Sequence, residues 1–294
     1  MRIYDCFTYL DENELLDLRL NILNKYVNKF IIIESKYRHN GEIKNRNFNI
    51  NNFSKFKDKI NYIYLDKEPP KISNNNKKIN PDQIIKNAYI RENYQRNSIN
   101  LGLKDCSEND FILISDVDEI PNLDGINLNL FKNHLVFFRQ KMFYYKFNLI
   151  YKNMIWHGTK GCLKKNLLSP QWLRNIKNKN YSKLRIDILF SKKKYSNLKF
   201  IENGGWHFTN IKKPEDVFKK LQTFLHHYDF EQSNITLDEI KKNMFEKKIN
   251  YDHFSDQKDN KKWGVNINLD YAFDKDLPKY LLENKIKYSE WIEK

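Results

Sequence analysis

Two aspartates in the middle of the chain, Asp116 and Asp118, combine a residue type and a position that suit metal chemistry. They follow directly on the apolar run FILIS, within DFILISDVDEIP at residues 110–121. A buried strand that ends in this way places carboxylates at the carboxyl edge of a parallel sheet, where open α/β folds bind ligands. If the backbone stays extended, both side chains share a face. Clustered carboxylates repel one another unless a cation lies between them, which predicts a Mg²⁺ or Mn²⁺ site that also holds a diphosphate.

The same residues have a plainer alternative. Asp is common at turns, so Asp116 would cap the turn after the strand while Asp118 and Glu119 stay solvated. Just upstream, the planar guanidinium of Arg96 could reach a phosphate, or could form a helix-surface pair with Glu92 four residues earlier.

A second compact group of functional residue types is GGWHF at residues 204–208. Paired glycines let the backbone approach a ligand closely, Trp206 offers a flat face, and His207 adds a nitrogen ligand or a hydrogen-bond donor. The alternative is a histidine packed in the core beside aromatic residues.

The hydrophobic pattern predicts the elements that must position these residues. Strand-like apolar runs lie at residues 2–8, 29–34, 60–65 and 111–115, and helical patterns lie at 11–23 and 81–101. Strands that alternate with helices and lack polar alternation indicate a mostly parallel sheet covered on both faces. The Asn- and Lys-rich stretch at residues 71–80 is expected to be an exposed loop.

Beyond Pro121 the pattern changes to shorter aromatic strands, at residues 135–139 and 142–150, and then to helices. Pro214 opens one of these helices. Its apolar stripe consists of Val217, Leu221, Leu225 and Tyr228. We expect one continuous domain in two parts rather than two independent domains.

Composition narrows the class of protein. The chain has 294 residues with 15% aromatics, and only eight Gly and seven Pro, which excludes a collagen-like or disordered chain. The net charge of +15 comes from lysines scattered among Asn and Ile, which is typical of solvated surface and of tolerance for anionic partners. Three cysteines without paired spacing, no long apolar run and no leader-like start predict a cytoplasmic protein without a membrane span or cleaved signal.

Several separated segments resemble glycosyltransferase family 17. In order they are IYDCFTYLDENELLDLRLNIL, VNKFIIIES with the following HNG, RENYQRNSINLGL, DFILISDVDEIP and NGGWHFT. The resemblance implies an α/β fold of the GT-A type for nucleotide-diphospho-sugar transferases over residues 1–294, with a nucleotide-sugar-binding half at 1–122. Residues 123–294 would form an acceptor-side half with C-terminal helices.

The family resemblance also implies an activity. It is metal-dependent, inverting transfer of a sugar, expected to be N-acetylglucosamine, from a UDP-sugar to a hydroxyl of a glycan or glycoconjugate, with Mn²⁺ or Mg²⁺ as cofactor. Eukaryotic members carry a membrane anchor, so this chain resembles the soluble bacterial or viral branch. A bacterial or virus-infected host cytoplasm is the expected location, with no specific nucleic-acid partner and with peripheral membrane contact left open.

Single residues take roles from the resemblance. Asp118 would bind the metal directly, Asp116 would contact ribose or metal-bound water, and His207 would be a third metal ligand. Glu34, at the end of the second strand, would lie near the uridine, and Arg96 would face ribose or phosphate.

An inverting transfer requires a group that takes the proton from the acceptor hydroxyl. The acids between residues 118 and 207 are Glu119, Asp124, Asp187 and Glu202. We prefer Glu202 because it directly precedes the segment expected to line the acceptor side, and Asp187 and Asp229 remain alternatives. Trp206 is the candidate for stacking on a sugar face, with a core tryptophan as its alternative.

Three other function classes stay open. A phosphatase of the haloacid dehalogenase type also places Asp-x-Asp at a strand end, although its nucleophile normally lies near the chain start. A basic nucleic-acid-binding protein would bind without a divalent ion and lose affinity steeply with salt. A catalytically inactive sugar-binding protein is the third.

Overall fold

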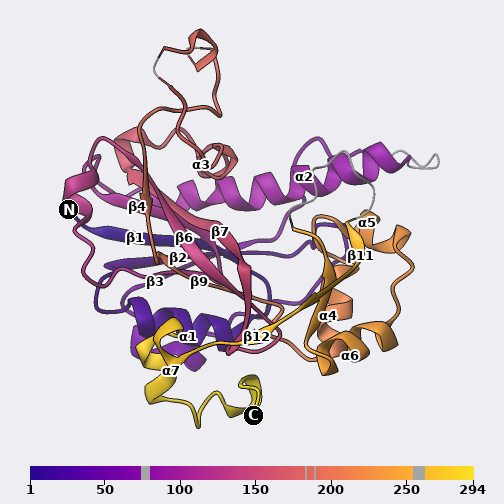
Figure 1. Ribbon diagram of the computed structural model, residues 1–294. Coiled ribbons are helices and arrows are strands. Elements are labelled where there is room, and N and C mark those ends of the chain that lie inside the picture. Colours follow the sequence, from indigo (N-terminus) through magenta and orange to yellow (C-terminus); the bar gives the residue numbers. More distant parts are fainter. Residues whose placement is uncertain (74–79, 183, 189, 254–261) are drawn as a thin grey trace.

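The computed structural model describes residues 1–73, 80–182, 184–188, 190–253 and 262–294. A ten-stranded sheet forms its centre, with the strand order β3-β2-β1-β4-β7-β6-β9-β5, while β8 pairs with β6 and β12 with β7 (Figure 1). The strands of this sheet are β1 Ile3–Tyr9, β2 Lys29–Ser35, β3 Ile60–Leu65, β4 Phe111–Asp116, β5 Glu119–Pro121, β6 Leu135–Tyr144, β7 Leu149–Leu163, β8 Leu198–Ile201, β9 Gly205–Thr209 and β12 Asp270–Tyr271. The helices are α1 Asn13–Leu23, α2 Pro81–Asn97, α3 Pro170–Asn175, α4 Pro214–Leu221, α5 His227–Gln232, α6 Leu237–Phe245 and α7 Lys279–Glu283.

The first four strands of this order are parallel, as the apolar runs predict. Both of their faces are covered, because α1 and α2 lie on opposite sides of the sheet (Figure 1). Phe7 and Ile32 belong to the core on the α1 side, whereas Cys6, Ile31 and Ile114 belong to the core on the α2 side. Strand alternation therefore fixes which side chains at the carboxyl edge face α2.

The remainder of the sheet is mixed. β4 pairs antiparallel with β7 and β7 antiparallel with β6, whereas β6 runs parallel to β8 and β9. The prediction of a mostly parallel sheet therefore holds for the N-terminal strands only. The boundary predicted between strands at 135–139 and 142–150 is wrong, because β6 runs unbroken to Tyr144. The pairing of β6 with β7 shifts register between residues 137 and 139 and between 141 and 142, and these shifts accommodate the polar residues of β6 within one strand.

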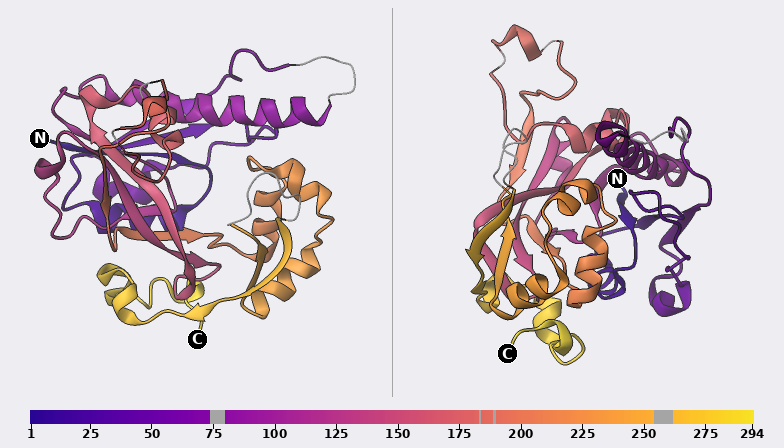
Figure 2. Two further views of the ribbon diagram at one scale, coloured as in Figure 1. Left: turned by 45° about the horizontal axis from the view of Figure 1, so that its top comes forward. Right: turned by 90° about the vertical axis from the view of Figure 1, so that its right-hand side faces the viewer.

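A helical lobe stands beside the sheet (Figure 2, left). It contains α4, α5, α6 and a two-stranded sheet of β10 Lys248–Tyr251 and β11 Trp263–Asn268, and its core holds Val217, Phe230 and Ile240. The predicted helix from Pro214 ends earlier than its stripe suggests, at Leu221. There the Oγ1 of Thr223 donates to the carbonyl of Lys219 (3.0 Å), a side-chain bond that competes with helix continuation.

The structure also bears on the helix predicted at 81–101 and the loop predicted at 71–80. The predicted helix at 81–101 is divided into α2 and a 3-10 helix at Ser98–Leu103. Of the loop predicted at 71–80, residues 74–79 lie outside the described residues. No helix in the described part of the chain is both long and apolar enough to cross a bilayer.

Candidate active site

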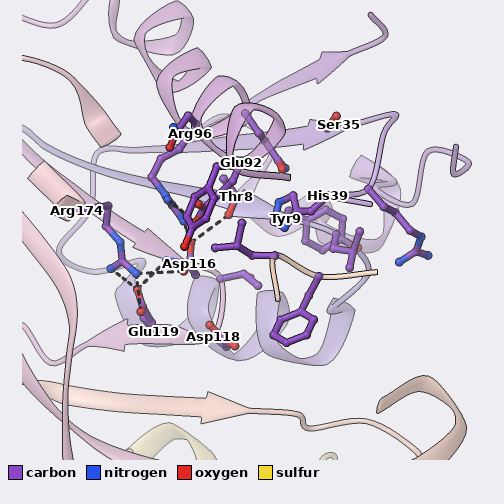
Figure 3. Close-up of a pocket in the computed structure, with 18 of the residues that line it drawn as sticks. Thr8, Tyr9, Ser35, His39, Glu92, Arg96, Asp116, Asp118, Glu119 and Arg174 are labelled. Atoms are coloured by element: carbon purple, nitrogen blue, oxygen red, sulfur yellow. Dashed lines mark hydrogen bonds and ion pairs between the residues drawn. The ribbon is translucent and has the colours of Figure 1, made fainter. Parts of the chain in front are cut away.

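A cavity of about 860 Å³ opens at the carboxyl ends of β1, β2 and β4. Thr8, Ser35 and Asp116 reach it from these three strands, and all three lie on the α2 side by strand alternation. Residues of α2 line one wall, and residues 220 and 223–226 of the helical lobe line another (Figure 3). This is the edge at which the sequence predicted ligand binding.

Asp116 is held between two arginines. Its Oδ1 accepts from Nη2 of Arg96 (3.0 Å) and its Oδ2 from Nη2 of Arg174 (3.1 Å), while Thr8 Oγ1 donates at 3.3 Å. Burial alone would raise the pKa of Asp116, but the two guanidinium groups outweigh it and hold this pKa well below its usual range. Arg96 also pairs with Glu92 (2.8 Å), so the predicted helix pair occurs, and the same side chain lines the cavity, where contact with a phosphate stays a prediction.

Asp118 lies on a turn rather than on a strand. β4 ends at Asp116 and the chain turns at residues 117–118, so the condition of an extended backbone, under which Asp116 and Asp118 would share a face, is not met. The turn directs Asp118 toward His207, whose Nε2 lies 3.6 Å from its Oδ2, and Lys220 Nζ lies 3.9 Å from the same oxygen. Burial opposes ionisation, yet His207 and then Lys220 bring the pKa of Asp118 below its ordinary value. Asp118 is therefore an ionised carboxylate in the cavity.

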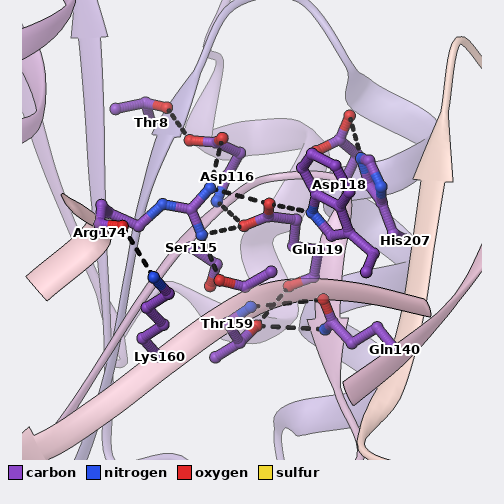
Figure 4. Close-up of polar contacts among 12 residues, drawn as sticks. Thr8, Ser115, Asp116, Asp118, Glu119, Gln140, Thr159, Lys160, Arg174 and His207 are labelled. Carbon is purple, nitrogen blue, oxygen red and sulfur yellow. Dashed lines mark hydrogen bonds and ion pairs between the residues drawn. The ribbon is translucent and has the colours of Figure 1, made fainter. Parts of the chain in front are cut away.

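Glu119 contacts both Arg174, which binds Asp116, and Trp156, which packs on His207. Its buried carboxylate accepts from Arg174 through both oxygens (2.7 and 2.9 Å) and from Trp156 Nε1 (2.7 Å). The ring of Trp156 in turn stacks on His207 at 4.8 Å between centroids. Figure 4 shows Arg174 bridging Asp116 and Glu119, with His207 beside Asp118. Glu119 and Trp156 line the cavity themselves, and through these contacts they orient the arginine and the imidazole.

A buried lysine, Lys160, holds the backbone of Arg174 in place. Lys160 on β7 donates to the carbonyls of Arg174 (2.8 Å) and Ile176 (2.7 Å), where α3 ends. Burial lowers the pKa of Lys160 to about 6. The end of α3, which carries Arg174, is thereby fixed to the sheet.

Arg19 supports the turn that carries Asp118. It is fully buried on α1 and forms two bonds with Asp5, at 2.6 and 2.7 Å. Its guanidinium also donates to the carbonyls of Asp116 (3.0 Å), Val117 (3.3 Å) and Glu119 (2.7 Å). One side chain from residue 19 therefore satisfies three carbonyls of the turn, while that of Asp118 accepts from the backbone of Phe208 (2.9 Å).

The predicted metal ligands are only partly brought together. Asp118 and His207 face one another, but Asp116 is engaged by arginines, and within the described residues no group of three or more His, Cys, Asp and Glu could hold a metal ion. The carboxylate suits Mn²⁺ or Mg²⁺, and the imidazole suits the transition metal Mn²⁺ better than Mg²⁺; Mg²⁺ is commonly held by one or two carboxylates and completes its shell with phosphate oxygens. The donor set therefore fits an ion that binds together with a diphosphate.

The three carboxylates predicted as the catalytic base are not among the described residues that line the cavity. Glu202 is exposed and pairs with Arg139. Asp187 pairs with Arg185 and Lys194 on a projecting segment. Asp229 is connected to the cavity indirectly, because it pairs with His226, which lines the cavity. Their assignment as the base remains a prediction.

Glu34 faces the α1 side of the sheet, away from the cavity. It is fully buried, pairs with Lys44, and accepts from the backbone of Asn47 (2.8 Å) and Phe48 (3.1 Å) and from Tyr62 Oη (2.8 Å). Its neighbour Ser35 is the residue of β2 that reaches the cavity. In the structure Glu34 anchors the segment at 44–48, and its place near a uridine stays a prediction.

Trp206, which follows two glycines, is partly buried and packs against the core, as the alternative of a core tryptophan predicts, and its stacking on a sugar stays a prediction. Trp206 alternates with His207 along β9, so it lines a second cavity of about 480 Å³ and donates from Nε1 to the carbonyl of Asp276 (2.8 Å). The glycines allow close approach of the chain to itself. A Cβ on Gly205 would lie 2.1 Å from the carbonyl oxygen of Ile120, and one on Gly204 would lie 2.7 Å from that of Ile201.

Several cavity residues escaped the sequence reasoning. They are Arg174, Lys220, His39 and His226. Arg174 carried no sequence signal, since it lies within an ordinary polar stretch. His39 was noted within HNG without a role, and its buried Nδ1 has no hydrogen-bond partner among the described residues. Figure 3 shows His39 across the cavity from Arg174.

This chain is similar in part to two named enzymes and to one solved structure. Two proteins described as Beta-1,4-mannosyl-glycoprotein 4-beta-N-acetylglucosaminyltransferase, from Homo sapiens and Rattus norvegicus, are each 29% identical over 129 residues. These matches cover 42% of this chain but only 23% and 22% of the relatives, so the matched part spans less than a quarter of their length. A solved structure, HddC from Yersinia pseudotuberculosis complexed with GMP-PN, is 13% identical with a TM-score of 0.28, covering 74% of this chain and 96% of that one.

The family comparison extends over nearly the whole sequence. A family model described as Glycosyltransferase family 17 matches residues 1–291. The resemblance of the separated segments is thereby confirmed, and with it the enzyme class: this chain belongs to glycosyltransferase family 17.

Proposed function

We propose that this glycosyltransferase has a GT-A type fold and moves N-acetylglucosamine from a UDP-sugar to a glycan hydroxyl, with inversion and with Mn²⁺ or Mg²⁺. One observation carries the proposal: the Asp118–His207 pair shares a cavity at the carboxyl ends of parallel strands with the cationic groups of Arg96, Arg174 and Lys220. The names of the human and rat relatives favour this donor.

The cavity residues divide into two tasks under this proposal. Asp118 and His207 would hold the divalent ion, which supplies positive charge to the departing diphosphate. Lys220, 3.9 Å from Asp118, adds a cation beside that place. Arg96 presents its planar guanidinium to phosphate or ribose oxygens, and Asp116 keeps it oriented.

The proton acceptor is assigned to His226. It lines the cavity, and its Nδ1 lies 3.6 Å from Oδ2 of Asp229, an arrangement in which a carboxylate orients an imidazole. Burial lowers the pKa of His226, so its ring is neutral at pH 7 and its other nitrogen can accept a proton. Asp229 then acts as a positioning residue, while Glu202 and Asp187 stay as alternatives outside the cavity.

His226→Gln is expected to lower kcat about a hundredfold while the KM for the donor stays nearly unchanged. Because the pKa of His226 is lowered, wild-type kcat should be level near neutral pH and fall as the pH drops through that lowered pKa, where the ring takes up a proton. The substitution removes this acid limb. An acid limb that persists in His226→Gln would contradict the assignment, and a kcat decrease in Glu202→Gln alone would transfer the role to Glu202.

The proposed donor is tested by thermal unfolding with nucleotide sugars, each with and without Mn²⁺. UDP-N-acetylglucosamine with Mn²⁺ should raise the apparent stability by about 2.7 kcal/mol at a hundred times its Kd, because a ligand that binds only the native state stabilises it. UDP-sugar without metal and GDP-sugar with metal are the matched comparisons. Equal shifts from all of them would exclude a specific metal-dependent UDP-sugar site.

A turnover assay separates the remaining function classes. Release of UDP from UDP-N-acetylglucosamine distinguishes a transferase from an inactive sugar-binding protein. Release of phosphate from simple phosphomonoesters, without UDP release, would instead support the phosphatase alternative.

A further inference from the structure

A projecting segment at residues 177–195, called the finger below, follows directly on α3. It stands away from the body at the top of Figure 1 and in the right-hand view of Figure 2. Backbone hydrogen bonds close its root, from Lys177 to the carbonyl of Lys193 (2.9 Å) and from Tyr181 to that of Tyr195 (3.0 Å). Within it, Asp187 is clamped by Arg185 and Lys194. Hydrogen bonds between the two ends of the finger thus close its root, and ion pairs hold part of its interior.

The tip of the finger carries large apolar side chains that nothing in the described chain covers. Leu184 is 93% exposed, Phe190 85% and Ile186 74%, all within seven residues. Elsewhere, comparably exposed apolar residues such as Phe245 (85%) and Ile286 (92%) stand apart in the sequence. Isolated exposed apolar residues are ordinary, but a group of them at the end of a projection indicates an interaction surface.

The charge of the finger indicates which partner this surface fits. Residues 177–195 contain seven Lys and Arg but a single acid, Asp187, whose charge is met by Arg185 and Lys194. Among the described residues of the finger, the exposed lysines that do not pair with Asp187 are Lys177, Lys179, Lys192 and Lys193. An apolar tip with lysines behind it matches an anionic bilayer, in which apolar side chains enter the headgroup boundary while lysines meet anionic lipid. A nucleic acid would use the lysines and leave the apolar tip in water.

We infer that the finger docks on the surface of an anionic lipid bilayer, with Leu184, Ile186 and Phe190 in the headgroup region. This inference does not depend on the proposed donor or metal. It does have a consequence for the site, because Lys193 at the root of the finger also lines the active cavity. The docking segment is therefore continuous with one residue of the cavity wall.

The test is cosedimentation of the full chain with vesicles of phosphatidylcholine alone or mixed with phosphatidylglycerol. The wild type should bind the mixed vesicles at least about tenfold more tightly, and the difference should shrink in high salt because screening weakens the lysine contribution. Leu184→Ser with Phe190→Ser should lose at least tenfold in binding. Phe245→Ser with Ile286→Ser removes equally exposed apolar residues elsewhere and should bind as the wild type does.

Other outcomes would overturn the inference. Equal binding by the finger variant and the wild type, equal losses in both double variants, or no binding to mixed vesicles would each exclude this surface as a bilayer contact. If gel filtration shows a wild-type dimer that the finger variant loses, and vesicles are not bound, the tip is a contact between copies of the chain. If Lys177→Glu with Lys179→Glu abolishes vesicle binding while Leu184→Ser with Phe190→Ser does not, the binding comes from charge alone. That result would also contradict the inference.

Discussion

Asp118→Ala is expected to reduce metal-dependent transfer about a thousandfold while leaving the fold intact. A metal ion at the leaving diphosphate contributes several kcal/mol of charge stabilisation, and each tenfold in rate corresponds to about 1.4 kcal/mol. Asp118 supplies the carboxylate for that ion, and its nearest partners, His207 and Lys220, lie at 3.6 and 3.9 Å. Neither of these two contacts is a short hydrogen bond, so the melting temperature should change little.

The measurement is kcat with UDP-N-acetylglucosamine across a Mn²⁺ titration. Asp124→Asn is the matched control, because Asp124 lies only six residues later and its side chain is 77% exposed. It should behave as the wild type. If Asp118→Ala keeps ordinary turnover at ordinary Mn²⁺ concentration, the metal role of this residue is wrong. His207→Ala should shift the Mn²⁺ titration in the same direction as Asp118→Ala.

Arg19→Met is expected to cost about 3–5 kcal/mol of stability, measured by urea unfolding. The substitution leaves Asp5 as an uncompensated buried charge, and removing one member of a buried ion pair carries a penalty of this size. Arg185→Met is the control, because its pair with Asp187 is solvent-exposed and such pairs contribute about 1 kcal/mol or less. A loss below about 1 kcal/mol in Arg19→Met would contradict the role given to the pair.

A second substitution separates the two tasks of Arg19. Asp5→Leu combined with Arg19→Met should regain part of the stability, because neither charge is then buried alone. The carbonyls of residues 116, 117 and 119 still lack their donor in this double variant. Its Mn²⁺ affinity should therefore remain low even where its stability recovers. Full recovery of metal binding would show that Arg19 does not hold the turn.

Alternation along strands predicts part of the site from the sequence. Ile31 and Ile33 share one face of β2, and Ser35 falls on that face while Glu34 falls on the other. That parity was readable from residues 29–35, and applying it would have excluded Glu34 from the cavity. The same reasoning placed Asp116 correctly at the carboxyl edge of β4, but it failed at Asp118 because the chain turns after Asp116.

Other parts of the site had no local signature. Arg174 lies 58 residues from Asp116, and the bond between them arises because β7 pairs with β4 and Lys160 anchors the end of α3. Arg19 lies on the buried, otherwise leucine-rich face of α1. An arginine at such a position is unusual, but the sequence does not show which residues it contacts. The histidine of the helical lobe reaches the cavity only because α4 ends at Leu221 instead of following its apolar stripe.

By itself, the sequence determined the parallel N-terminal strands, the edge at which carboxylates gather, and the family. These properties follow from periodicity over a few residues and from segments that are contiguous in the chain. Only the tertiary structure decided which cations meet those carboxylates, which histidines join them and which predicted acids lie elsewhere. Such pairings depend on distances between residues that are far apart in sequence, and these distances are set by packing across the whole sheet rather than by any local pattern.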